Sequence, residues 1–138
     1  MAIRLTIDIN PRRLDGAVGP ILRRKHASIT RQTATEARSR VPVLTGNLGR
    51  SLIEMPQEYS ALRVTGGVET RGVPYAAAVH EGSRPHRIVA RRAKALRFMM
   101  GGEVVFRKSV WHPGTKARPF LTNAAQAVIA RDPDLSHR

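Results

Sequence analysis

The sequence predicts an α+β fold in which a small antiparallel sheet is packed by one long N-terminal helix and one C-terminal helix. Residues 3–9 alternate between apolar and polar side chains, which is the period of a half-buried strand. Apolar residues recur with a helical period over 20–40 and again after Pro119, and the chain between these stretches is mostly short strand-like runs. Helices that do not alternate regularly with strands are typical of the α+β class.

The first helix is predicted over about 20–40. Asn10 and Pro11 also suit a helix start, but Gly16 and Gly19 interrupt any helix that begins there. A rotation of about 100° per residue gathers one stripe that should be buried, formed by Val18, Leu22, Ile29, Thr33 and Ala37. The opposite face carries arginines that are candidates for contact with a partner or a polyanion: Arg24, Arg31 and Arg38.

The end of this helix is marked by Pro42, because the residue before a proline disfavours the helical region. The run Thr45-Gly46-Asn47 then predicts a loop, and a new section starts at Leu48. Two strands follow, over 51–55 and 60–69, and they are predicted to be joined by a turn at 56–59.

The middle of the chain is predicted to be mostly β. One or two helical turns over 76–79 end before Gly82 and Pro85. Strands are then expected over 86–90, 96–100 and 103–110, with the Gly101-Gly102 pair as a turn between the last two.

The last helix is predicted to open at Pro119 and to close at Asp132-Pro133. Its buried face should consist of Phe120, Leu121, Ala124, Ala125 and Val128. Residues 132–138 are expected to fray. Because aromatic residues are scarce, the large anchors of the core are expected among Phe98, Phe106, Trp111 and Phe120.

The composition favours a single domain over residues 1–138, since a chain of this length can bury a core without metals or cross-links. No cysteine is present, which excludes disulfides and fits a protein made in a reducing cytoplasm. The N-terminus lacks the apolar core of a signal peptide, and no apolar run reaches the length of a membrane helix. We therefore expect a soluble protein with no membrane contact.

The charge balance is strongly basic, with 24 Lys and Arg against 10 Asp and Glu and a formal charge of +14. A positive field of this strength attracts polyanions, and a nucleic acid, an acidic protein surface and an acidic membrane face are all consistent with it. A solvated basic surface with no partner is the fourth interpretation. Six basic residues fall within 84–97 and are called here the basic strip: Arg84, Arg87, Arg91, Arg92, Lys94 and Arg97. Unpaired buried charges cost several kcal/mol, so we expect the strip to be a loop or a β-hairpin arm that projects toward a polyanionic surface.

Catalytic and metal sites are disfavoured by residue spacing. His80, Glu81, His86 and His112 match no zinc-ligand pattern, and surface or turn histidines are the better interpretation. There is no nucleophile motif, no phosphate-binding loop and no carboxylate pair. We expect no enzyme and no cofactor. A hydrolase or nuclease built on these histidines stays a rival only if a divalent metal stabilises the fold.

Three segments together resemble the tail-completion, or neck, family of long-tailed double-stranded-DNA bacteriophages. They are VPVLTGNLGRSL at 41–52, PYAAAVHEG at 74–82 and HPGTKARPFL at 112–121, and the resemblance spans roughly residues 20–130. Leu44, Gly49, the run 80–83 and Thr122-Asn123 depart from the family pattern. The matching positions are candidates for interfaces or family-specific structure: Pro42, Thr45, Gly46, Asn47, Leu48, Arg50, Tyr75, Ala76, Glu81, Gly82, Pro113, Gly114, Pro119, Phe120 and Leu121.

The resemblance implies a minor structural protein of the virion, placed at the head–tail interface and assembled in the host cytoplasm. Its partners would be copies of itself in a ring, expected to be a hexamer, together with a head-completion or stopper protein, a tail terminator or a tail tube protein, and DNA in the channel. Two alternatives stay open: a tail terminator or head-closure protein at the adjacent ring position, and a sequence-independent nucleic-acid-binding module. The absence of stacking aromatics other than Phe98 beside the strip disfavours the last.

Overall fold

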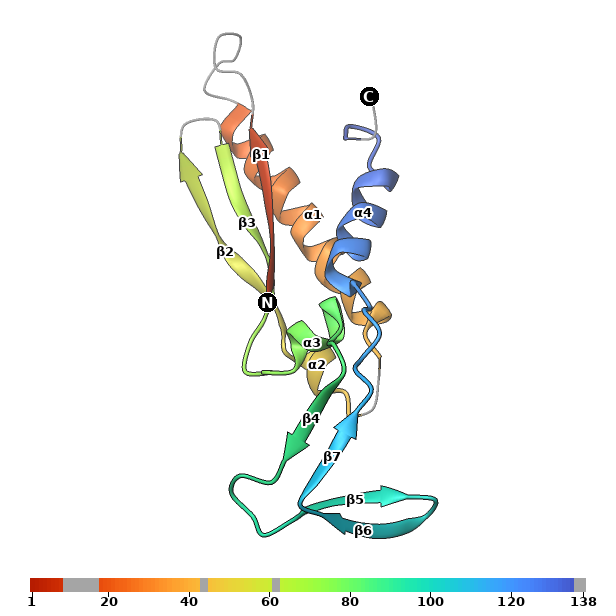
Figure 1. Ribbon diagram of the computed structural model, residues 1–138. Helices are drawn as coiled ribbons and strands as arrows, with labels where there is room; N and C mark the ends of the chain where they lie inside the picture. The colour runs from red at the N-terminus through yellow and green to blue at the C-terminus, as the bar shows by residue number, and fades with distance from the viewer. Residues whose placement is uncertain (9–17, 43–44, 61–62, 136–138) are drawn as a thin grey trace.

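The computed structural model describes residues 1–8, 18–42, 45–60 and 63–135. A body and an arm can be distinguished in it (Figure 1). The body consists of a three-stranded antiparallel sheet in the order β1-β3-β2, a long helix α1 that packs against all three strands, and a C-terminal helix α4 that packs along α1. This is the predicted α+β fold, with both predicted helices in place.

The body strands are β1 (Ala2–Asp8), β2 (Leu52–Ser60) and β3 (Arg63–Thr70). Its helices are α1 (Val18–Arg40), α2 (Asn47–Arg50), α3 (Ala76–Glu81) and α4 (Phe120–Arg131). The arm contains β4 (His86–Val89) paired with β7 (Ser109–His112), and β5 (Leu96–Met100) paired with β6 (Glu103–Arg107). We use "the arm" for residues 84–113.

The predicted faces of both main helices are confirmed. In α1, Leu22, Ile29, Thr33 and Ala37 are buried and Val18 is half-buried, whereas the three arginines of the opposite face are exposed. In α4, all five predicted core residues are buried, Pro119 is the N-cap and Asp132 is the C-cap. The helix starts suggested by Asn10 and Pro11, with the interrupting Gly16, lie outside the described residues.

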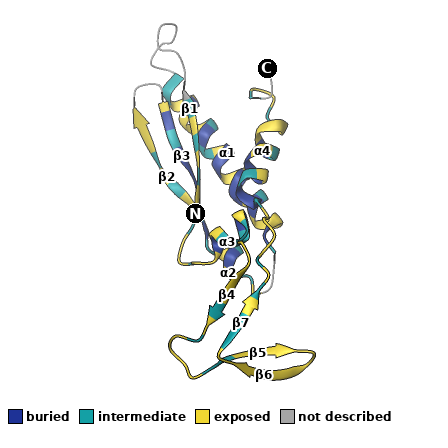
Figure 2. Cartoon of the chain, in the orientation of Figure 1, coloured by how far each residue is buried: buried dark blue, intermediate teal, exposed yellow. Residues whose placement is uncertain are grey.

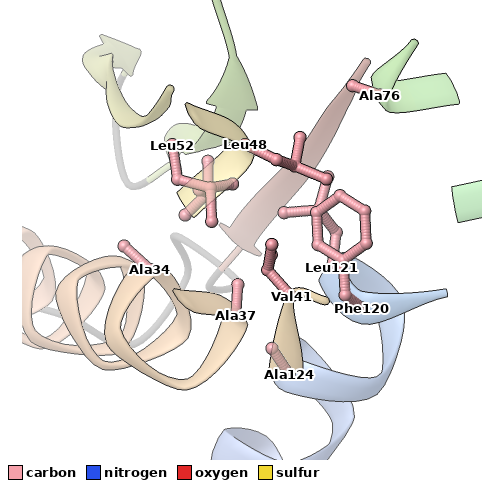
Figure 3. Close-up of a cluster of buried hydrophobic side chains, with 10 residues drawn as sticks. Ala34, Ala37, Val41, Leu48, Leu52, Ala76, Phe120, Leu121 and Ala124 are labelled. Carbon is pink, nitrogen blue, oxygen red and sulfur yellow. The ribbon is translucent and has the colours of Figure 1, made fainter. Parts of the chain in front are cut away.

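The core lies where α1, α4 and the start of β2 meet, and Phe120 and Leu121 are at its centre (Figure 3). Small residues on the facing helices, Ala34, Ala37 and Ala124, are fully buried and allow the helices to approach closely. The buried residues are in the body, and the arm has none (Figure 2). Of the four aromatic residues considered as core anchors, Phe120 alone is buried in the core, whereas Phe98 is half-buried and Phe106 and Trp111 are exposed in the arm.

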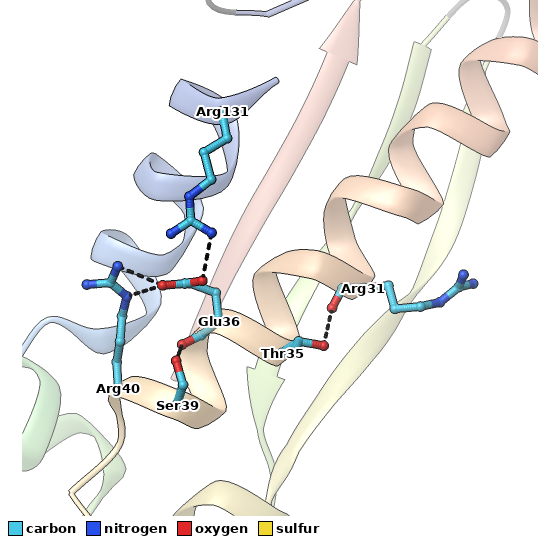
Figure 4. Close-up of polar contacts among 6 residues, drawn as sticks. All are labelled: Arg31, Thr35, Glu36, Ser39, Arg40 and Arg131. Atoms are coloured by element: carbon cyan, nitrogen blue, oxygen red, sulfur yellow. Dashed lines mark hydrogen bonds and ion pairs between the residues drawn. The ribbon is translucent and has the colours of Figure 1, made fainter. Parts of the chain in front are cut away.

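Ion pairs join the two long helices along their exposed edge. Glu36 of α1 accepts hydrogen bonds from Arg131 of α4 and from Arg40, and these lower the pKa of Glu36 (Figure 4). Lys25 lies 2.7 Å from a carboxylate oxygen of Asp132 and 2.7 Å from one of Asp134. Residues 132–135, expected to fray, are thus held to α1 in part, and 136–138 lie outside the described residues.

Three sequence predictions need correction. Residues 56–59 are not a turn but part of β2, where the register shifts between Met55 and Glu58. Proline is tolerated there because β2 is an edge strand and a bulge needs no donor at that position. The predicted strand 103–110 is divided into β6 and β7, because the chain changes pairing partner at Lys108. The loop at Thr45-Gly46-Asn47 leads at once into the helical turn α2, which was not predicted.

Candidate docking surface

The three segments that resemble the phage family meet at one end of the body. The first begins directly after α1 and contains α2 and the start of β2; the second contains α3; the third connects β7 to α4. The amide of Arg118 donates a 2.9 Å hydrogen bond to the carbonyl of Val79, so the third segment lies directly on the second. α2 and α3 lie between the sheet and the arm (Figure 1).

A pocket of about 460 Å³ opens between the first and second segments. Most of its lining is apolar, and Tyr75 stands about half exposed beside it. Six of its lining residues are among the interface candidates from the sequence: Pro42, Thr45, Gly46, Asn47, Leu48 and Tyr75. Val79 completes the lining and was not predicted. The structure therefore brings residues about 30 positions apart in the chain together into one concave surface.

The rim of this pocket is shaped by Gly46, which has φ +73° and precedes α2. Arg50 folds back over the turn and donates hydrogen bonds to the carbonyl of Thr45 at 3.0 Å and to Oδ1 of Asn47 at 2.7 Å. The guanidinium of Arg50 is thus engaged within the turn. Its role in this structure is to hold the pocket rim.

The second and third segments are joined at the base of the arm by two glycines in the left-handed region. Gly82 has φ +80° and Gly114 has φ +93°. A Cβ on Gly82 would lie 2.6 Å from the carbonyl oxygen of Thr115, and a Cβ on Gly114 would lie 2.3 Å from that of Ser83. The two backbones therefore approach each other too closely for any other residue.

The remaining family-motif candidates divide between core and surface. Ala76, Phe120 and Leu121 are buried, and Pro119 caps α4, so these residues are structural. Glu81 and Pro113 are exposed and remain available for contact.

The four residues considered as a metal or catalytic site are spread over separate places. Contrary to the prediction of a surface or turn histidine, His80 is buried, with its ring 5.2 Å from Phe120 in an edge-to-face contact. Burial lowers the pKa of His80, and the carboxylate of Glu81 opposes this only in part. His86 and His112 are cross-strand neighbours on β4 and β7. Within the described ranges, no three His, Asp or Glu side chains gather as metal ligands.

The basic strip lies in the arm, as predicted. All six of its side chains are exposed: Arg84 precedes β4, Arg87 is on β4, Arg91, Arg92 and Lys94 are on the connection to β5, and Arg97 is on β5. Within the strip, the side chain of Arg87 donates hydrogen bonds from Nε and Nη2 to Oγ of Ser109, at 3.0 and 2.7 Å.

Apolar side chains exposed on the same arm were missed by the sequence analysis. Trp111, Phe106 and Met99 are well exposed, and Met100 and Val104 lie near the hairpin tip. Trp111 and Phe106 were expected among the core anchors, and only the absence of a covering layer distinguishes them from core residues.

Comparison of the chain with known protein families, with curated proteins and with solved structures found no match. Among the described residues, no helix combines the length and the apolar character needed to cross a membrane.

Proposed function

We propose that this chain is a structural protein of a bacteriophage virion, a tail-completion or neck component that forms a ring between head and tail. The observation that supports the proposal best is the convergence of the three family-like segments on one end of the body. Six of the motif residues line a single open pocket there, and two of the motif-bearing segments are locked together by close backbone contact.

The shape of the chain suits a cyclic assembly. Closed rings need a heterologous interface, in which one patch meets a different patch on the neighbour. The pocket between α2 and α3 and the exposed arginine face of α1 are two candidate patches of this kind on one chain. In the proposed ring, which we take to be a hexamer, they would contact neighbouring copies, and the arm would contact the adjacent head-completion, terminator or tail tube protein.

The proposal includes no catalysis. The described histidines divide between buried positions of the body and the arm, and the pocket lining offers a tyrosine hydroxyl, a threonine hydroxyl and an asparagine amide without an adjacent base. A docking surface needs shape and apolar area rather than a nucleophile, and the pocket provides both.

Detection of this chain in purified virions tests the proposal directly. Peptides of the chain should be present in stoichiometric amount in particles of the phage that encodes it, and its gene should lie between those of the head connector and the major tail protein. Absence from the particles would contradict a virion role.

Reversal of three arm charges tests where the head–tail contact lies. Arg87→Glu, Arg91→Glu and Arg92→Glu together should leave the chain folded and block the joining of heads to tails. A control with the same change in net charge reverses Arg4, Arg23 and Arg71 on the body, which are also exposed and are not among the candidate contact residues. Normal joining with the arm variant would remove the arm from the contact.

A sequence-independent nucleic-acid-binding module is the second candidate, and the exposed basic strip favours it. Such binding is dominated by phosphate contacts and falls steeply with salt. Affinity for a DNA duplex that disappears at moderate salt would argue against nucleic-acid binding as the main activity.

A further inference from the structure

Each of the two ladders of the arm leaves one face uncovered. In an antiparallel pair, residues directly opposite each other project from the same face. Arg87 is opposite Trp111 in the β4–β7 ladder, and Trp111 is 69% exposed. Arg97 is opposite Phe106 in the β5–β6 hairpin, and Phe106 is 58% exposed. Both uncovered faces are thus built around an arginine beside an exposed aromatic ring.

Aliphatic side chains extend both faces. Val89 shares the face of Trp111, and Met99 is opposite Val104 on the face of Phe106. All three are exposed. We use "the arm face" as a collective name for these residues on the open faces of both ladders: Arg87, Val89, Trp111, Arg97, Met99, Val104 and Phe106. On the other side of the β5–β6 hairpin, Leu96, Phe98 and Val105 are half-buried, so the hairpin has one sheltered and one open side.

An open apolar face on a two-stranded sheet indicates a missing partner. Isolated two-stranded sheets are at best marginally stable in water, and clustered exposed apolar side chains mark interaction surfaces. Trp, Phe, Met and Arg are the residues enriched in protein–protein interfaces. Nucleic acids are bound by cationic side chains that contact phosphates and by aromatic rings that stack on bases. The exposed aliphatic side chains of Val89, Met99 and Val104 have no role in such binding, so they favour a protein partner.

The charge of the arm restricts the partner further. Residues 84–113 carry eight Lys or Arg side chains and one acidic side chain, Glu103. The rest of the chain is also more basic than acidic, so a second copy would be repelled by the arm. An acidic surface would instead be attracted and oriented by it.

We infer that the arm face binds a different protein, through an apolar patch that is rimmed by carboxylates. The apolar side chains would be covered by the patch, and Arg87 and Arg97 would pair with carboxylates at its edge. The inference rests on the proposed function, which places the contact between this neck component and the adjacent one. It adds the chemistry of the surface that the adjacent protein presents.

Fluorescence of Trp111 can measure the binding, because it is the single tryptophan of the chain. The full chain is titrated with a glutamate–tyrosine copolymer, with polyglutamate of the same length and with single-stranded oligothymidylate, and the indole is excited selectively. The copolymer should shift the emission to shorter wavelength and bind at least about tenfold more tightly than polyglutamate, as expected when aromatic contacts add to charge pairing.

Two matched pairs of variants identify the face used. Met99 and Met100 are adjacent and similarly exposed, at 66% and 62%, but they project from opposite faces of the hairpin. Met99→Ser should weaken copolymer binding by about fivefold or more and Met100→Ser by less than about twofold, since only an interface core residue has a large effect. Arg97 shares the face of Met99, and Arg107 shares the face of Met100. Arg97→Gln should therefore weaken copolymer binding as Met99→Ser does, and Arg107→Gln should have the small effect of Met100→Ser.

Three results would overturn the inference: no binding of the copolymer, equal effects of Met99→Ser and Met100→Ser, or tighter binding of oligothymidylate than of the copolymer. The last would assign the arm to nucleic acid. Circular dichroism of each variant shows whether the chain remains folded. Because detection in virions does not depend on this titration, failure of the inference and failure of the proposed function are distinguishable.

Discussion

The backbones of Ser83 and Thr115 exchange a pair of hydrogen bonds at the base of the arm. The amide of Ser83 donates to the carbonyl of Thr115 at 2.9 Å, and the amide of Thr115 donates to the carbonyl of Ser83 at 3.0 Å. Gly82 and Gly114 flank this pair, each with its Cα hydrogen against the opposite backbone. The arm is therefore attached to the body through an antiparallel bridge at which neither glycine has room for a Cβ.

The first prediction is that Gly114→Ala destabilises the fold more than a strained φ alone can explain. A Cβ at Gly114 would lie 2.3 Å from the Ser83 oxygen. Gly102 is the control, because its φ of +89° is close to the +93° of Gly114 and nothing lies within 4 Å of its added Cβ. We expect Gly102→Ala to cost about 1 to 2 kcal/mol and Gly114→Ala at least about 1 kcal/mol more, from overpacking, by denaturant unfolding. Equal losses of stability in the two variants would show that the two backbones at the bridge move apart without an energetic cost.

The second prediction concerns Phe120, which is 2% exposed at the centre of the core. Phe120→Ala should cost about 3 to 5 kcal/mol, as large-to-small changes at buried aromatic positions do. Ile129→Ala is the control in the same helix, since Ile129 is partly exposed and should cost less than about 1 kcal/mol. A loss below about 1 kcal/mol for Phe120→Ala as well would move this side chain out of the core.

The body could be predicted from the sequence because its signals are local. The 3.6-residue period of α1 and α4 identifies the buried faces without knowledge of their neighbours. A turn is wrongly predicted at 56–59 because Pro56 normally breaks strands, and only the sheet order shows that β2 is an edge where proline is allowed. The division at Lys108 was missed for a related reason, since a change of pairing partner leaves no local pattern.

The candidate surface was predictable in part. Family-like motifs indicated Pro42 to Leu48 and Tyr75, but nothing in their spacing showed that they line one pocket. The exposure of Trp111 could not be predicted either. An apolar aromatic in an alternating strand has the same pattern whether its face packs on a core or remains open, and only the architecture decides between the two.

The third prediction is a loss of stability in mild acid that His80 causes. Because burial lowers the pKa of His80 in the fold, the unfolded chain binds a proton more readily than the folded chain. Stability should therefore be fully present above the ordinary value of 6.5 and fall as the pH drops below it. His80→Gln should flatten this part of the profile of melting temperature against pH. His86→Gln, at an exposed position of the arm, serves as the control and should leave it unchanged.

The last prediction concerns His26, which is fully buried and joins α1 to both edge strands of the sheet. Its Nε2 donates a 3.0 Å hydrogen bond to the carbonyl of Leu5 in β1, so Nδ1 is the acceptor for the amide of Gln57 in β2 at 3.0 Å.

Gln57→Ala removes that donor and leaves Nδ1 with the hydroxyl of Thr30 at 3.5 Å, which is too long to replace it. A buried polar atom that loses its partner costs about 1 to 3 kcal/mol, and we expect a loss in this range by denaturant unfolding. Gln32→Ala is the matched control, because the amide of Gln32 donates only to the exposed Ser28 on its own helix. That change should stay within about 0.5 kcal/mol. If both glutamine variants lose the same small amount of unfolding free energy, water replaces the lost donor at Nδ1. The hydrogen bond between His26 and Gln57 then does not stabilise the packing of the sheet on α1.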